Sequence, residues 1–139
     1  MTIIDMLSEG VAVTNKDEAA GEMLADFTDH KVGMQLEESA VTIVVSDGAV
    51  ALEQGIRADC HAVMKLSAVD LCEAIDNSCD LMEIREKGEL LKGDINDPGI
   101  AVHFMATFPL FDAMVRYYEE NEDFKHRVDT LKKSLKDEV

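Results

Sequence analysis

The chain has 139 residues, enough for one domain with a buried core, and it carries 29 acidic against 13 basic residues for a net charge of −16. A surface of this sign repels phosphate backbones at long range, so we expect no nucleic-acid partner. The three cysteines form no even framework, no signal-peptide pattern precedes them and no apolar run reaches the ~18 residues of a transmembrane helix, so we expect a cytoplasmic protein without an integral membrane segment.

The first predicted elements are helical. Residues 1–15 hold an apolar patch that breaks at Gly10, which predicts only a short turn of helix and a separate N-terminal segment. From Asn15, a good N-cap residue followed by acids, one-sided apolar spacing predicts a helix that ends near His30. We therefore place the main domain at residues 16–120.

Four strands are predicted next. Residues 32–36 alternate between apolar and polar, residues 41–45 are β-branched and apolar, and residues 49–54 follow a Ser-Asp-Gly turn. Residues 56–66 show the longest alternation, with Cys60 and Met64 on the apolar side and His61 on the polar side. Because the turns are short, these sequential strands imply an antiparallel sheet.

The pattern becomes helical again at Ser67. Asp70 follows three residues later, as in a capping box, and the apolar stripe predicts a helix that ends near Asn77. Residues 80–86 predict a second short helix, and residues 89–94 a fifth, short strand. We therefore expect an α+β fold in which helices cover a five-stranded, mostly antiparallel sheet.

The remaining segments are predicted to be helical. Asp97 and Pro98 are typical of a helix start, and Pro109 ends or kinks this helix and could open the next. Residues 121–139 form a C-terminal amphipathic helix of the same domain, with one apolar seam: Phe124, Val128, Leu131 and Leu135. The seam is too short for a coiled coil, so we expect it to pack on its own domain, and pairing with a second copy is the alternative.

No compact catalytic signature is present for nucleotide binding, acyl transfer or zinc hydrolysis, and we expect no catalytic residue, metal or cofactor. Cys60 and His61 are adjacent on a strand and point to opposite faces, so they form no nucleophile–base pair. His103 lies within an apolar stretch, where it is either a partly exposed structural residue or a hydrogen-bond partner for a ligand.

A set of apolar residues from the predicted sheet and helices faces the space between them. Methionine suits irregular gaps and surfaces that accept varied apolar shapes, although Met and Phe at helical spacing are also ordinary core residues. The candidate ligand-binding residues are Met64, Leu81, Met82, Phe104, Met105, Phe108, Phe111 and Met114.

Two stretches together resemble the sterol carrier protein type 2 family, the sterol-binding and lipid-transfer domain. They are RADCHAVMKLSAVDLCEAID (57–76) and GELLKGD (88–94), and the likeness covers about residues 16–115. The matching residues are Asp59, Leu66, Ser67, Gly88, Leu90, Gly93 and Asp94. The resemblance implies a sheet covered by helices with a hydrophobic tunnel for a sterol or fatty acyl chain. It also implies a structural Gly93–Asp94 turn, with the C-terminal helix as a candidate lid.

The first functional hypothesis is a non-enzymatic protein that binds or carries a lipid or another apolar ligand. The alternative is a structural or protein-interaction module with the same fold and a filled core, with a possible homodimer through the C-terminal helices. A third hypothesis is an enzyme for an apolar substrate, with His103 or Asp94 at the mouth of a pocket.

Overall fold

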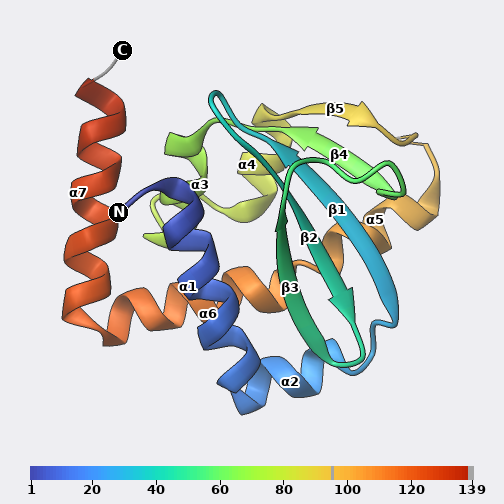
Figure 1. Cartoon of the computed structure of the whole chain (residues 1–139), viewed down its shortest axis with the longest axis horizontal. Helices are drawn as coiled ribbons and strands as arrows, with labels where there is room; N and C mark the ends of the chain where they lie inside the picture. Colours follow the sequence, from blue (N-terminus) through green and yellow to red (C-terminus); the bar gives the residue numbers. More distant parts are fainter. Residues whose placement is uncertain (95, 138–139) are drawn as a thin grey trace.

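A computed structural model describes residues 1–94 and 96–137 of the chain. The helices and strands follow in the order α1 (Ile3–Lys16), α2 (Glu18–Leu24), β1 (Asp29–Gln35), β2 (Ala40–Ser46), β3 (Ala49–Gln54), β4 (Ala62–Lys65), α3 (Ala68–Ile75), α4 (Leu81–Lys87), β5 (Glu89–Lys92), α5 (Pro98–Met105), α6 (Phe108–Glu120) and α7 (Glu122–Asp137), as Figure 1 shows.

The strands form one sheet in the order β3-β2-β1-β4-β5. β1 pairs in parallel with β4, and the other neighbouring strands are antiparallel. The predicted α+β fold with a mostly antiparallel, helix-covered sheet is therefore confirmed. The fourth strand does not continue the meander, because the chain crosses the sheet after β3 and inserts β4 on the far side of β1.

The main core lies between the sheet and the helices, and α6 passes behind the sheet in Figure 1. Val41, Ile43 and Val45 alternate along β2 and are fully buried in this core. They meet fully buried side chains from α1, α3, α6 and α7, namely Met6, Leu7, Leu71, Ile75, Leu110, Met114 and Phe124. Helices far apart in the sequence therefore share one core.

α1 runs without interruption, so the predicted break at Gly10 is wrong. Gly10 lies where α1 meets α6, and a Cβ atom there would come within 2.6 Å of the Met114 Cε atom. The glycine thus permits a close approach of two helices and does not mark a turn. The expected division after residue 15 falls inside this helix, which contributes to the main core.

The predicted helix from Asn15 to His30 is also corrected. Asp17 is the N-cap of the short α2, and His30 belongs to β1. Asn15 lies in α1, and its side-chain amide donates to the Val50 carbonyl at 2.8 Å and accepts from the Val50 N–H at 2.9 Å. This amide satisfies both backbone groups of Val50 in β3. Asn15 therefore joins α1 to that strand and does not cap α2.

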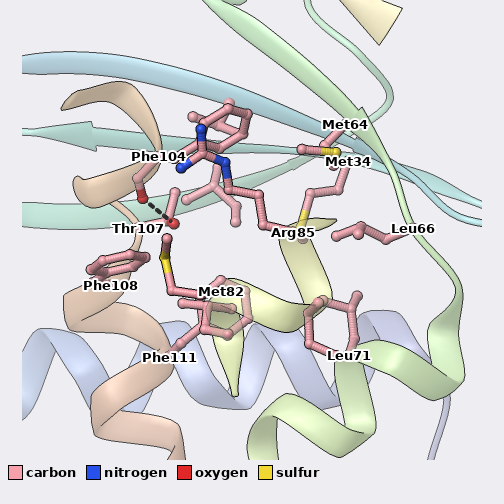
Figure 2. Close-up of a pocket in the computed structure, with 14 residues that line it drawn as sticks. Met34, Met64, Leu66, Leu71, Met82, Arg85, Phe104, Thr107, Phe108 and Phe111 are labelled. Carbon is pink, nitrogen blue, oxygen red and sulfur yellow. Dashed lines mark hydrogen bonds between the residues drawn. The ribbon is translucent and has the colours of Figure 1, made fainter. Parts of the chain in front are cut away.

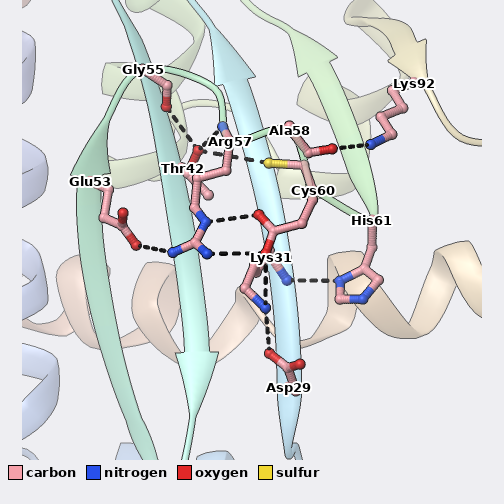
Figure 3. A network of polar contacts seen from close by, with 11 residues as sticks. Asp29, Lys31, Thr42, Glu53, Gly55, Arg57, Ala58, Cys60, His61 and Lys92 are labelled. Carbon is pink, nitrogen blue, oxygen red and sulfur yellow. Dashed lines mark hydrogen bonds and ion pairs between the residues drawn. The ribbon is translucent and has the colours of Figure 1, made fainter.

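The predicted strand over residues 56–66 is wrong in its first half, because residues 55–61 cross the outer face of the sheet (Figure 3). The buried Thr42 hydroxyl fixes this crossing by donating to the Gly55 carbonyl at 2.8 Å and accepting from the Arg57 N–H at 3.1 Å. Ala62 and Met64 are buried on the inner face of β4, as predicted.

Three predicted helix starts are confirmed. Ser67, Asp97 and Asn121 each accept a backbone N–H with a side-chain oxygen at 2.9–3.0 Å, which satisfies one of the free donors at the helix start. The predicted short helix and fifth strand after residue 79 are present as α4 and β5, with ends shifted by one or two residues.

The apolar late segment forms α5 and the first half of α6. The chain turns at Ala106 and Thr107, and Pro109 lies in the first turn of α6, as predicted for a proline that opens a helix. By length and composition Pro98–Glu120 could cross a membrane, contrary to the expectation of no such run, and 44% of its most apolar window is buried inside this structure.

The seam of α7 packs on its own domain, as predicted. Phe124 and Val128 are fully buried, Leu131 is 9% exposed, and α7 contacts α3 and α6. These three side chains therefore offer little apolar surface to a second copy. The predicted helix extended to residue 139, and residues 138–139 lie outside the described part of the chain.

Candidate functional site

An apolar pocket lies between the inner face of the sheet and helices α3 to α6 (Figure 2). Its cavity has a volume of about 50 Å³. All lining residues except Arg85 and Thr107 are apolar: Val32, Met34, Ile43, Met64, Leu66, Leu71, Leu81, Met82, Ile84, Arg85, Phe104, Thr107, Phe108 and Phe111. The pocket therefore suits an apolar ligand group, which burial stabilises by about 25 cal/mol per Å².

Strand register supplies one wall of the pocket. Val32 and Met34 are two residues apart on β1, so both point to the inner face of the sheet. Met34 is the register partner of Met64 on the parallel neighbour β4, which places the two thioethers beside each other. Flexible methionine side chains can adapt to ligands of different shape.

The single hydroxyl in the lining is already satisfied. Thr107 lies in the turn between α5 and α6 and is 6% exposed. Its hydroxyl donates to the Phe104 carbonyl at 2.7 Å, which is the dashed contact in Figure 2. This contact leaves the pocket without a free neutral donor aimed at a ligand, so Arg85 is its main polar group.

The pocket continues into a wider groove of about 450 Å³ along α4, β5 and α5. Met64, Met82, Arg85 and Phe104 line both spaces. Gly88 in the groove lining permits close packing on β4, because a Cβ atom there would lie 2.6 Å from the Leu66 Cδ2 atom and 2.8 Å from the Met64 Sδ atom. Together the pocket and groove fall within the range of about 300–1,000 Å³ that is typical of small-molecule sites.

Six of the eight candidate residues line the pocket, namely Met64, Leu81, Met82, Phe104, Phe108 and Phe111. Their contact with a ligand stays a prediction. The structure places Met105 and Met114 elsewhere. Met105 is 48% exposed on α5, and Met114 is fully buried against Gly10 in the main core. Helical spacing gave the correct helices for both residues, but it could not tell which face of each helix meets the cavity.

Several lining residues were not among the candidates. Val32 and Met34 belong to a predicted alternating strand, so the alternation that placed Met64 inward applied to them as well. Arg85 gave no such signal, because a basic residue in the last turn of a short helix is ordinary. The guanidinium reaches the pocket because α4 packs on α3 and Arg85 lies over the Phe104 ring of α5.

His103 and Asp94 do not line the pocket or the groove. The His103 Nδ1 atom lies 2.7 Å from the His30 Nδ1 atom, and the His61 ring stacks on the His103 ring with 4.3 Å between centroids. Burial, and then the charge of His61, lowers the pKa of His30 and His103, which favours neutral rings. Asp94 accepts from the Asn96 N–H at 2.9 Å, in the structural role that the resemblance implied.

All three cysteines are free and buried. Cys60 belongs to the crossing segment and is 2% exposed, and burial raises the pKa of the Cys72 thiol to about 12. A thiol that stays protonated is a poor nucleophile and a poor metal ligand. In residues 1–94 and 96–137, no three His, Cys, Asp or Glu side chains are placed to hold a metal ion.

Neither a protein-family model nor a curated protein sequence matches the chain. Solved structures do match. The solution structure of a conserved hypothetical protein from Thermus thermophilus, described as possibly a sterol carrier protein, has a TM-score of 0.62 at 14% identity, over 81% of this chain and 85% of that chain.

A crystal structure of sterol carrier protein 2 has a TM-score of 0.59 at 15% identity, over 80% of this chain and 94% of that chain. UbiJ-SCP2, a ubiquinone synthesis protein, has a TM-score of 0.51 at 16% identity, over 74% of this chain and 82% of that chain. At these identities the likeness shows the fold. The chain has the sterol carrier protein 2 fold, and the resemblance drawn from its sequence is confirmed at this level.

Proposed function

We propose that this protein is a non-enzymatic carrier in the cytoplasm that binds a lipid or fatty-acyl-type molecule between the sheet and α3 to α6. The observation that carries the proposal is the pocket itself, in which twelve of fourteen lining residues are apolar. Buried apolar surface and a wider groove at its mouth fit a ligand held by burial.

The names of the similar structures support an apolar ligand. One structure is a sterol carrier protein, a second is described as possibly one, and a third is a ubiquinone synthesis protein. Sterols and ubiquinone are both largely hydrocarbon. A site of this composition on this fold therefore favours a molecule of the same general class.

The first test is native mass spectrometry of the purified protein, followed by titration with dodecanol as an uncharged amphiphile. We expect either a co-purified lipid or saturable binding of one dodecanol per chain. A protein that purifies empty and binds no dodecanol would contradict the proposal.

Two exposed methionines provide a matched pair of variants. Met82 is 49% exposed and lines the pocket and the groove, whereas Met105 is 48% exposed and lines neither. We expect Met82→Glu to weaken dodecanol binding by about tenfold, because it places a hydrated carboxylate beside the hydrocarbon chain. Met105→Glu should leave the affinity within about twofold. Equal loss in the two variants would point to a general effect of added charge.

The second candidate is an interaction module with a filled core. The small volume of the inner cavity, about 50 Å³, favours it, because a ligand must displace flexible side chains to enter. In that case dodecanol should not bind, and the protein should form a dimer or another complex in sedimentation experiments.

A further inference from the structure

The four arginines of the chain differ in their ion pairs. Arg57, Arg116 and Arg127 each pair with two carboxylates within 4.0 Å. Arg85 pairs with no carboxylate of residues 1–94 and 96–137, although acids outnumber bases by more than two to one in this chain. An unpaired, half-buried guanidinium in so acidic a protein is available for an anion from outside the chain.

Arg85 lies at the boundary between the pocket and the groove. It comes from the last turn of α4 and lines both spaces. Its guanidinium carbon lies 4.9 Å from the centre of the Phe104 ring, and Figure 2 shows the side chain reaching across the pocket toward that ring. The cation–π contact holds the guanidinium over the apolar lining, where burial strengthens its interaction with an anion.

The surroundings limit the charge of that anion. Glu86 also lines the groove, and the net charge of the chain is −16. A headgroup with several negative charges would be repelled by both. A single carboxylate, by contrast, matches one planar guanidinium, which can donate two parallel hydrogen bonds to it.

We infer that Arg85 is a specificity-determining residue that binds the carboxylate of a long-chain fatty acid, whose hydrocarbon chain enters the pocket. This inference rests on the proposed function, since it names the ligand class for the same site. Arg85 distinguishes the acid from an alcohol of equal chain length, because only the ionised acid forms a charge-assisted pair with the guanidinium.

The test compares lauric acid with dodecanol by calorimetric titration at neutral pH. We expect the wild-type protein to bind lauric acid about tenfold more tightly than dodecanol, the size of one hydrogen-bonded charge pair. Arg85→Met keeps the apolar cover of Phe104 but removes the charge. It should lower the affinity for lauric acid by about tenfold and change that for dodecanol by less than about twofold.

Two further variants distinguish the effect of the guanidinium group from the effect of positive charge in general. Arg85→Lys keeps the charge without the planar fork, so it should restore part of the preference for the acid. Lys133→Met removes an exposed lysine of α7, far along the chain from the groove, and should leave both affinities unchanged.

The outcomes also separate this inference from the proposed function. If the wild-type protein binds both ligands equally and Arg85→Met changes neither affinity, the carrier function stands and the role of Arg85 is wrong. If the wild-type protein binds neither ligand, both proposals are wrong. If Lys133→Met reduces the preference as strongly as Arg85→Met, the preference reflects net charge and the role of Arg85 is again wrong.

Discussion

At the scale of single residues, three histidines form a polar cluster that lines neither the pocket nor the groove. His30, His61 and His103 come from β1, the crossing segment and α5, and their rings form one cluster. A hydrogen bond between two neutral imidazoles needs one donor and one acceptor, so two protonated rings cannot share it. The bond between His30 and His103, which joins α5 to β1, therefore needs at least one neutral ring.

Acid should weaken the folded state through this cluster. Burial, followed by the charge of His61, keeps the pKa of His30 and His103 below the ordinary value, although Asp29 and Asp97 act in the opposite direction. The unfolded chain takes up protons near pH ~6.5, before the folded chain does. The free energy of unfolding is therefore highest above that pH and falls as the pH drops from ~6.5 through the lower folded pKa values.

Urea unfolding between pH ~7.5 and ~5.5 checks this dependence. His30→Asn removes one titrating ring and should show a smaller loss of stability on acidification than the wild-type protein. His126→Asn, at an exposed position on α7 outside the cluster, is the control and should follow the wild-type curve. If the free energy of unfolding depends on pH in the same way in all three proteins, the histidine cluster is not the cause of the acid destabilisation.

At the scale of elements, the crossing of α1 and α6 depends on one missing side chain. A Cβ atom on Gly10 would overlap the Met114 side chain, which is fully buried and has little room to move. Gly10→Ala should therefore destabilise the protein by about 1–3 kcal/mol through overpacking, even though alanine favours a helix by about 1 kcal/mol over glycine.

Gly21 offers the matched control for this substitution. It also lies within a helix, α2, but a Cβ atom there would meet nothing within 4 Å. We expect Gly21→Ala to stabilise the protein by about 0.5–1 kcal/mol. Thermal or urea unfolding measures both effects, and an equal gain at the two positions would show that Met114 moves aside without cost.

The same elements explain what the sequence could predict. Capped starts such as Ser67 and Asp97 are local signals, and both helices begin where expected. Gly10 and the alternating residues 56–61 were misread because their causes are distant in the sequence: Met114 lies against the glycine, and Thr42 holds the crossing segment. Local patterns cannot contain such contacts.

In the candidate site, too, the residues set by local patterns were predicted and those set by distant contacts were not. Met64 on β4 and Phe111 on α6 lie in the pocket wall as predicted, whereas Met114 on the same helix as Phe111 lies in the main core. Met105 was not placed correctly, because α5 is apolar on nearly all sides and its spacing does not define an inner face. Arg85 reaches the pocket through the packing of α4 on α3 and through its contact with the Phe104 ring, and no local pattern describes either.

At the scale of the whole molecule, scarce basic residues join helices that are distant in the sequence. Arg116 pairs with Asp17 between α6 and α2, and Arg127 pairs with Glu9 between α7 and α1. Both ion pairs are partly exposed, so each contributes no more than about 1 kcal/mol. Thirteen basic residues also leave most of the 29 acids without a counter-charge.

Long-range repulsion should therefore outweigh the ion pairs, and added salt should stabilise the fold. Raising NaCl from ~0.01 M to ~0.15 M shortens the screening length from about 30 Å to about 8 Å. That length still spans a contact ion pair but not the distance between acidic residues on different elements, so repulsion is screened more than attraction. We expect the midpoint of thermal unfolding to rise by a few degrees, while sucrose at equal osmolality controls for effects unrelated to charge. A midpoint that falls with NaCl would show instead that the ion pairs between helices dominate the electrostatic free energy of the fold.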